Sequence, residues 1–182
     1  VAQKIKVFQA QYLQFQPQLV VMQAGEHPDS TTYICMKAKA AEEVSIKFNH
    51  ITFPEAAMAE EIIQVVKKLS DDDAVSGVLV QLPLGPNVNA DNTCTVTEAV
   101  SLKKDVDGFH AYNISHLSSC AASLLFIPCT PAAVICLLES TGISITGANA
   151  VMLSRSNIIR NPVAALLRSH NATVTQCHSH TK

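Results

Sequence analysis

Two side chains that could act together on a bound substrate, Tyr33 and Lys37, stand four residues apart. We expect a helix around them, because they follow the apolar run 19–22, and Asp29 or Ser30 can serve as its N-cap. Residues four apart lie on one face of a helix, so an aromatic ring and an amine would stand side by side. Such a pair suits a flat substrate that needs proton transfer. The alternative is a surface helix whose tyrosine and lysine only cover neighbouring apolar groups.

Two more polar side chains stand where a ligand could reach them. Gln81 lies near the end of the apolar run 78–82, and its amide can hydrogen-bond a lysine or a water molecule without adding charge. Asp107 stands before Gly108, and its carboxylate can accept hydrogen bonds from N–H groups of a ligand. The alternatives are a structural cap at the strand end for Gln81 and a turn former for Asp107.

The segments that would position these residues alternate between helical and extended patterns. A first helix is expected near residues 5–13, before Pro17. The apolar patterns then predict strands at 19–23, 46–53 and 78–82, helices at about 30–43 and 55–69, a loop at 85–92 and a short helix at 96–102. Strands that alternate with helices of about ten or more residues indicate parallel βαβ units.

A second unit is expected near the end of the sequence. Thr130 and Pro131 are a strong helix start, with Thr130 as the N-cap, and this helix should run to about Glu139 and link two domains. A strand at 150–153, a turn at 154–161, a helix at 162–168 and a strand at 172–176 then follow the pattern of a dinucleotide-binding fold. The sequence therefore predicts an α/β protein, in which a parallel-sheet βαβ catalytic domain (1–139) precedes a partial Rossmann-like nucleotide-binding domain (140–182).

The composition favours a small-molecule partner. The 182 residues are 48% hydrophobic, which is ample for a packed core. A net charge of -2 gives no electrostatic footprint for nucleic acid or for an anionic membrane. No apolar stretch is long enough to span a membrane and no secretory signal is visible, so we expect a cytoplasmic protein.

The cysteines and histidines do not predict a metal site. The six cysteines contain no C-x-x-C pair, so we expect them to remain thiols. Cys177, His178 and His180 could be read as a metal cluster, but they lack a second pair of ligands. We therefore expect no metal.

Further motifs accompany the helix of Tyr33 and Lys37 in a fixed order. They are Gly25 and Ser30 before that pair, then V-Q-L-P-L at 80–84, K-D-V-D-G at 104–108, P-C-T-P at 128–131, and Arg155 and Ser156 before Pro162. In that order and at those separations they resemble the bifunctional methylenetetrahydrofolate dehydrogenase/methenyltetrahydrofolate cyclohydrolase family, most closely its cytosolic eukaryotic trifunctional members. The resemblance runs from Val1 to Lys182.

The resemblance implies a reaction and a set of residues that carry it. NADP-dependent oxidation would convert 5,10-methylenetetrahydrofolate to the methenyl form, and hydrolysis would then give 10-formyltetrahydrofolate. Lys37 matches the family's catalytic lysine, which assists hydration and ring opening, and Gln81 would be its neighbour. A lysine can act as a base near neutral pH only where burial or neighbouring dipoles favour its neutral form. Tyr33 would stack on the rings of the folate, and Asp107 would bind the pterin.

For the cofactor, the resemblance points to the first turn of the nucleotide unit. Arg155 and Ser156 match the family's residues after the first strand, and Ser179 follows the next strand. An arginine here could bind the adenosine 2′-phosphate together with Ser179, so we expect NADP, with NAD as the alternative. Arg155 could instead only cap the edge of the sheet. The resemblance also implies a homodimer.

The chain departs from the family at five glycines. Other residues replace them, at Ser45, Ser115, Ala133, Ser154 and Arg160. Glycine serves where φ is positive or where a backbone comes close to a ligand. We expect Ser154 and Arg160 to lie in the phosphate turn and to obstruct the pyrophosphate, although the charge of Arg160 could partly offset this.

A further departure is expected after Gln176. A complete nucleotide domain needs more strands and helices there, and the family's glycine-rich closing segment is absent. A two-strand fragment would leave an unpaired edge and an uncovered apolar face. We therefore expect a divergent, C-terminally truncated enzyme of one-carbon folate metabolism, whose activity could be reduced or lost. The competing hypothesis is a non-catalytic remnant that binds folate or forms a dimer.

Overall fold

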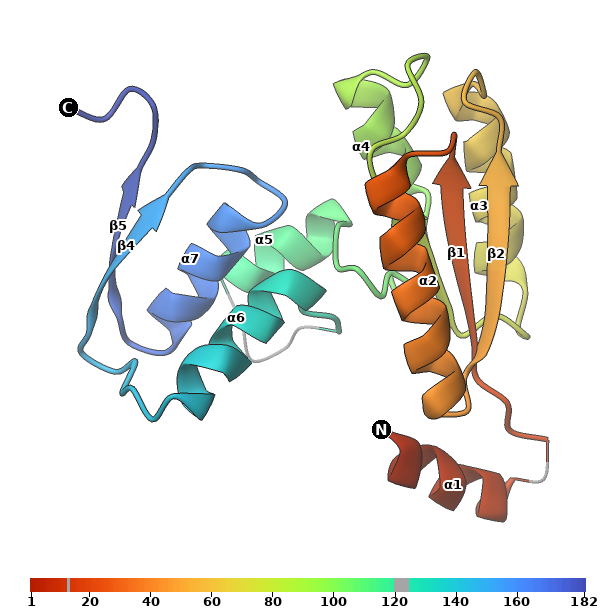
Figure 1. Cartoon of the computed structure of the whole chain (residues 1–182), viewed down its shortest axis with the longest axis horizontal. Coiled ribbons are helices and arrows are strands. Elements are labelled where there is room, and N and C mark those ends of the chain that lie inside the picture. Colours follow the sequence, from red (N-terminus) through yellow and green to blue (C-terminus); the bar gives the residue numbers. More distant parts are fainter. Residues whose placement is uncertain (13, 120–124) are drawn as a thin grey trace. The chain divides into compact units, whose positions relative to one another are not determined.

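The computed structural model describes residues 1–12, 14–119 and 125–182. They divide into two compact units, Val1–Asp105 and Val106–Lys182, and each unit has a hydrophobic core of its own. Figure 1 shows the helices and strands of both units along the chain. The functional domains that we expected, 1–139 and 140–182, remain a prediction.

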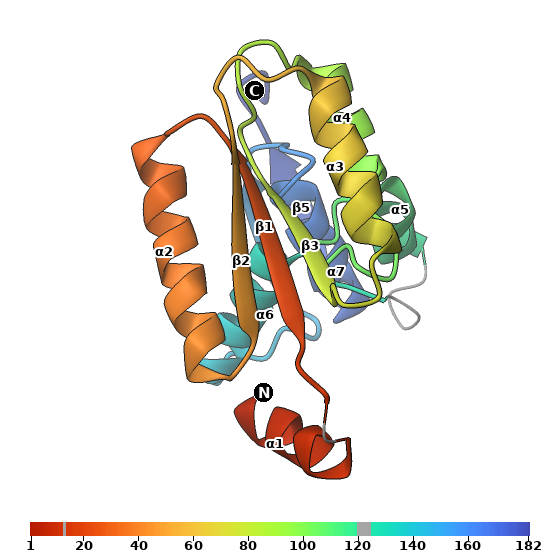
Figure 2. The same ribbon diagram turned by 90° about the vertical axis from the view of Figure 1, so that its right-hand side faces the viewer.

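The first unit is built on a parallel sheet of three strands in the order β2-β1-β3. The strands are β1 (Gln18–Ala24), β2 (Lys47–Phe53) and β3 (Gly77–Gln81), and the helices are α1 (Ala2–Gln11), α2 (Pro28–Glu43), α3 (Ala59–Asp71) and α4 (Ala90–Glu98). Helix α2 covers one face of the sheet, and α3 and α4 lie on the other side (Figure 2). Parallel pairing with helical crossovers confirms the expected βαβ units.

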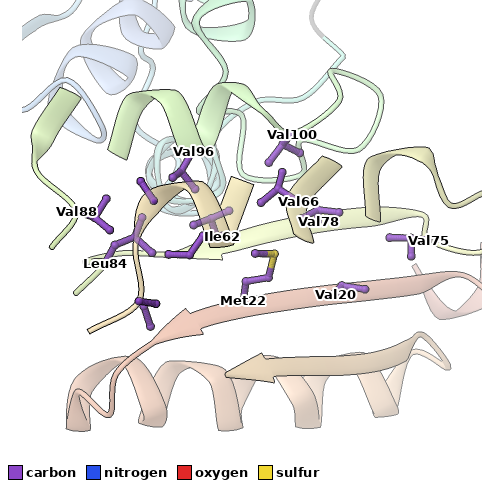
Figure 3. Close-up of a cluster of buried hydrophobic side chains, with 14 residues drawn as sticks. Val20, Met22, Ile62, Val66, Val75, Val78, Leu84, Val88, Val96 and Val100 are labelled. Carbon is purple, nitrogen blue, oxygen red and sulfur yellow. The ribbon is translucent and has the colours of Figure 1, made fainter. Parts of the chain in front are cut away.

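The core of the first unit lies between the sheet and helices α3 and α4 (Figure 3). Alternate residues of β1, Val20 and Met22, point to this side. They belong to one cluster with Ile62 and Val66 of α3 and with Val96 of α4, and these side chains are almost fully buried. Burial of each such side chain stabilises the fold by roughly 1.5–3 kcal/mol.

Capping side chains, rather than apolar spacing, decide where α3 and α4 begin. Helix α3 begins at Ala59, later than we expected, and the Glu61 carboxylate accepts the N–H of Met58 at 3.1 Å. Helix α4 begins at Ala90, earlier than we expected, because the Asn89 side chain accepts the N–H of the third residue of the helix at 2.8 Å. The expected loop is correspondingly shorter.

The second unit contains a strand-helix-strand motif and two further helices. Its elements are α5 (Ala111–Ser119), α6 (Cys129–Ser140), β4 (Asn149–Leu153), α7 (Arg160–Ser169) and β5 (Thr173–Cys177). Strands β4 and β5 are parallel, as we expected for a dinucleotide-binding fold. The core gathers Val163 and Leu166 of α7, Leu117 of α5 and Ile135 of α6. The sequence did not predict α5, because its buried residues are one leucine and Asn113 and so give no apolar period.

Helices α6 and α7 begin earlier than we expected. The N-cap of α6 is Pro128, so Thr130 is not the cap and instead lies in the first turn. Helix α7 begins at Arg160, and Pro162 stands in its first turn, where its missing N–H breaks no helical hydrogen bond. Arg160 therefore belongs to the helix and not to the turn in which we expected it.

One face of the β4–β5 pair is exposed. Ala150 and Met152 pack against the core on the α7 side, whereas the alternate residues Val151 and Leu153 are 63% and 73% exposed. This is the uncovered apolar face that we expected for two strands.

The described cysteines, at 35, 94, 129, 136 and 177, remain thiols and form no disulfide, as we expected. Cys120, the sixth cysteine, lies outside the described residues. So does residue 13, at the end of the first helix that we expected. Within the described ranges, no helix has the length and the apolar character that crossing a membrane requires.

Candidate functional site

Lys37 and Gln81 meet on one side of the sheet of the first unit. Lys37 lies on α2, and Gln81 is the last residue of β3. Nζ of Lys37 donates a hydrogen bond to Oε1 of Gln81 at 2.9 Å, and both side chains are half-buried. Nε2 of Gln81 donates to the carbonyl of Leu82 at 2.9 Å. Because that carbonyl can only accept, the amide must turn its oxygen toward the lysine.

Helix α2 follows the carboxyl end of β1 through a tight turn. Gly25 in this turn has a φ of 72°, in the left-handed region that favours glycine. The helix then begins at Pro28, and its N-cap is His27 rather than Asp29 or Ser30. Proline at the first position has the φ that a helix needs and lacks only an N–H that the first turn would leave unpaired. The turn and the proline together start the helix that carries Tyr33 and Lys37.

Tyr33 stands one helical turn before Lys37 and is 62% exposed. An exposed ring beside a half-buried amine is open to a flat ligand, as the four-residue spacing suggested. The structure thus brings Tyr33, Lys37 and Gln81 to the α2 side of the first unit. Their catalytic and substrate-binding roles remain predictions.

Asp107 lies in the second unit, in the turn before Gly108. Gly108 has a φ of 68°, and a Cβ at this position would lie 3.0 Å from the backbone nitrogen of Pro128. Sγ of Cys129 also lies 3.6 Å from the carbonyl of Val106. The turn of Asp107 is therefore packed against the start of α6. The role of Asp107 in binding folate remains a prediction.

Gln23 is a buried polar residue beside the candidate site that we did not predict from the sequence. It is 3% exposed, pairs with Gln81 in the register of β1 and β3, and donates from Nε2 to Oγ1 of Thr31 at 3.4 Å. Gln23 therefore links β1 to the first turns of α2. The signal in the sequence was a lone polar residue at the end of an apolar run.

A pocket of about 480 Å³ opens at the carboxyl ends of β4 and β5. It is lined by Leu153, Ser154, Arg155, Cys177, His178 and Ser179. Arg155 and Ser179, two of the three residues predicted to bind the cofactor, therefore line the same pocket. Ser156 is in the same loop but does not line the pocket, and its carbonyl accepts the N–H of Asn161 at 3.0 Å.

The five positions at which we expected the family to have glycine fall into two groups. Ser45 and Ser154 have φ angles of 62° and 105°, so a glycine there would relieve backbone strain. Ser115, Ala133 and Arg160 lie in helices, where the structure shows no need for a positive φ. Arg160 begins α7 and does not line the pocket, so the expectation that it obstructs the phosphate turn was wrong in placing it there. Ser154 does line the pocket.

The histidines beside the pocket contact each other. The rings of His178 and His180 are 5.9 Å apart between centroids, and the backbone N–H of His180 donates to the ring atom Nδ1 of His178 at 3.1 Å. In the part of the chain that the structure describes, no three histidine, cysteine, aspartate or glutamate residues form a group that could hold a metal ion.

Comparison with known families finds two matches along the chain. Residues 1–107 match the tetrahydrofolate dehydrogenase/cyclohydrolase catalytic domain, and residues 128–182 match the NAD(P)-binding domain of the same enzymes. The matches leave out residues 108–127, and they include Asp107 and the residues that line the pocket of Arg155.

Several known proteins are similar to this chain. It is 46% identical to the mitochondrial C-1-tetrahydrofolate synthase of Schizosaccharomyces pombe and 42% identical to the cytoplasmic one of Homo sapiens, over 100% and 92% of the chain. The chain spans 18% of the length of each of these relatives. The crystal structure of the Trypanosoma brucei methylenetetrahydrofolate dehydrogenase-cyclohydrolase with NADP and an inhibitor superposes with a TM-score of 0.92 at 30% identity, over 99% of this chain and 60% of that one. The fold class is confirmed, and the chain belongs to the tetrahydrofolate dehydrogenase/cyclohydrolase family.

Proposed function

We propose that the chain acts in one-carbon folate metabolism, in the NADP-dependent oxidation of 5,10-methylenetetrahydrofolate and the hydrolysis of the methenyl product to 10-formyltetrahydrofolate. The observation that carries the proposal is the hydrogen bond that Lys37 donates to Gln81 at 2.9 Å, together with the exposed ring of Tyr33. Tyr33 stands one helical turn before Lys37 on α2. A folate offers a flat ring system for the tyrosine and a reacting carbon for the amine. Family membership supports the same reaction.

Lys37 and Gln81 would handle the proton of the hydrolysis. Gln81 accepts one N–H of Lys37 and so holds the amine in place. The other hydrogen-bonding positions of the Lys37 amine are then left for a water molecule. In its neutral form the amine would take a proton from this water as the oxygen adds to the methenyl carbon. A carbon–nitrogen bond of the ring then breaks, and the carbon remains on the other nitrogen as a formyl group. The net products are the formyl compound and one proton.

Substrate binding would fall to Tyr33, Gln81 and Asp107. The exposed tyrosine ring would stack on the folate, and the Asp107 carboxylate would accept hydrogen bonds from the pterin. Asp107 is half-buried, which suits a carboxylate that binds N–H groups out of water. The packing of its turn against Pro128 supports a fixed position for it.

The pocket of the second unit fits a dinucleotide phosphate. Arg155 and Ser179 line it, and a guanidinium with a hydroxyl is a suitable donor set for a 2′-phosphate, with Ser156 in the same loop. The bound NADP would supply the hydride acceptor for the oxidation step. The choice of NADP over NAD rests on Arg155. We further propose a homodimer in the cytoplasm, which sedimentation of the purified protein and fractionation of cells would test.

A coupled assay on the purified protein tests the proposed function. It follows oxidation of methylenetetrahydrofolate with NADP and hydrolysis of methenyltetrahydrofolate, beside calorimetric titration with folate. We expect folate binding together with at least the hydrolysis, because Lys37, Gln81 and Tyr33 all lie in the first unit. Folate binding with neither activity would support the competing remnant, and no folate binding would overturn both.

A further inference from the structure

Three amide side chains connect the loop 154–159 to strand β5. Nε2 of Gln176 donates to the carbonyl of Ser154 at 3.0 Å and to Oδ1 of Asn161 at 2.6 Å. Nδ2 of Asn161 donates in turn to Oδ1 of Asn157 at 2.6 Å. The loop that leaves β4 is therefore tied both to the end of β5 and to the first turn of α7.

A backbone carbonyl fixes the direction of these hydrogen bonds. The carbonyl of Ser154 can only accept, so Gln176 must present its nitrogen to it, and the second hydrogen of that nitrogen points to Asn161. Asn161 must then present its oxygen to Gln176 and its nitrogen to Asn157. Turning any of the three amides over would break at least one of these hydrogen bonds. Only one orientation of each amide therefore allows all of them to form.

The residue that Gln176 holds has a strained backbone. Ser154 has a φ of 105°, which a residue with a side chain keeps only when its surroundings enforce it. Both of its backbone groups are held by β5, because its N–H donates to the carbonyl of Cys177 at 2.7 Å and its carbonyl accepts from Gln176. Gln176 therefore makes one of the two hydrogen bonds that keep the backbone of Ser154 in the left-handed region.

Arg155 lies between two anchored carbonyls. The carbonyl of Ser154 accepts from Gln176, and the carbonyl of Ser156 accepts the backbone N–H of Asn161 at 3.0 Å. The same asparagine takes part in both anchors. The backbone of Arg155 is thus fixed on each side, and Arg155 lines the pocket together with Ser179.

We propose that Gln176 is a positioning residue for Arg155 and thereby sets the preference of the pocket for a 2′-phosphorylated dinucleotide. The proposal rests on the proposed function, because it takes NADP as the ligand. Gln176 does not line the pocket and acts only through the Ser154 carbonyl and Asn161. Loss of its two hydrogen bonds releases the Ser154 carbonyl, one of the two anchors beside Arg155, so that Arg155 no longer meets the phosphate in a fixed place.

The first variant is Gln176→Leu, which keeps a similar volume and removes both donors. We expect its Kd for NADP to rise about tenfold with less than about a twofold change for NAD, because only the 2′-phosphate needs Arg155. Amide hydrogen exchange of the peptide covering 154–161 should become faster. The matched control is Gln64→Leu, at an exposed glutamine of α3 in the other unit, which should change neither reading.

The second variant adds Ser154→Gly to Gln176→Leu. Glycine adopts a positive φ without strain, so the loop should no longer need Gln176 to hold this conformation. We expect the Kd for NADP to return to within about threefold of the unchanged protein. A double variant that binds as weakly as Gln176→Leu would overturn the proposal, as would equal losses for NADP and NAD.

Hydrogen exchange separates this proposal from the proposed function. If the unchanged protein binds neither dinucleotide, the choice of cofactor is wrong, and the exchange of 154–161 still tests what Gln176 does. Faster exchange in Gln176→Leu with recovery in the double variant supports the positioning role. Exchange that is the same in all three proteins overturns it.

Discussion

Lys37 is expected to act on the reacting carbon and to contribute little to folate binding. Replacing it by alanine should lower the rate of methenyltetrahydrofolate hydrolysis by at least about 100-fold, because no other group would take the proton of the water. The Kd for folate should stay within about tenfold, since Tyr33 and Asp107 would supply most of the binding. Hydrolysis is measured by the loss of methenyl absorbance, and binding by calorimetry.

The matched control for this prediction is Lys39→Ala. Lys39 is exposed on the same helix, so its removal tests the loss of a lysine from α2 without loss of the bond to Gln81. It should leave both measurements unchanged. If Lys37→Ala weakened binding as severely as it slowed hydrolysis, the lysine would be a binding group and not a base.

Asp107 is expected to bind the pterin through its charge. The change Asp107→Asn keeps the shape of the side chain and should weaken folate binding by roughly 1.5–3 kcal/mol, the range for a hydrogen bond to a charged group. Titration calorimetry measures the loss, and thermal unfolding checks that the turn before Gly108 persists. An unchanged Kd would make Asp107 a turn former only. Asp73→Asn, at an exposed site in the first unit, is the control.

Among the helices, α2, α6 and α7 end in a related way, with a left-handed residue after the C-cap. These residues are Ser45, Gly142 and Asn171, with φ angles of 62°, 76° and 65°. After α2, the N–H of Ser45 donates to the carbonyl of Glu42 and that of Ile46 to the carbonyl of Ala41, at 3.0 and 2.8 Å. This pair of bonds is a Schellman motif, which is usually completed by glycine. Serine at this position is strained.

The changes Ser45→Gly and Ser115→Gly should therefore have opposite effects. At 45 glycine removes the left-handed strain and should stabilise the fold by about 1 kcal/mol, whereas at 115, inside α5, it should destabilise by about 0.5–1 kcal/mol. Urea unfolding of the two variants measures both. The same sign for both changes would show that φ does not decide the effect.

At the scale of the whole molecule, each compact unit carries a separate core. Ile62 belongs to the core of the first unit and Leu166 to the core of the second, and each is at most 4% exposed. Truncating either to alanine should destabilise its own unit by about 2–5 kcal/mol, because a cavity remains. Hydrogen exchange should quicken within 1–105 for Ile62→Ala and within 106–182 for Leu166→Ala.

Leu137→Ala controls for the loss of a leucine side chain as such. Leu137 is 67% exposed on α6, so no cavity forms and exchange should hardly change. Faster exchange across both units after either core truncation would mean that they unfold together.

The amino-acid sequence by itself determined the elements and the candidate residues that depend on short spacing. The apolar runs of β1 and β3 and the four-residue spacing of Ile62 and Val66 predicted strands and a helix, because burial on one face imposes that period. The spacing of Tyr33 and Lys37 placed both on one helix, and the apolar run 78–82 placed Gln81 near a strand end, whereas the hydrogen bond between Lys37 and Gln81 belongs to the tertiary structure.

The tertiary structure alone decided what depends on contacts between residues far apart in sequence. It placed Gln23 beside Gln81 through strand register, and it packed Gly108 against Pro128. It also separated the five positions at which we expected a family glycine into those with a positive φ and those inside helices, because a backbone angle follows from the helix or turn that the surrounding chain imposes. Arg160 is an example, because the resemblance to the family suggested that it lies in the phosphate turn. The chain is already helical before Pro162, so Arg160 is the first residue of α7.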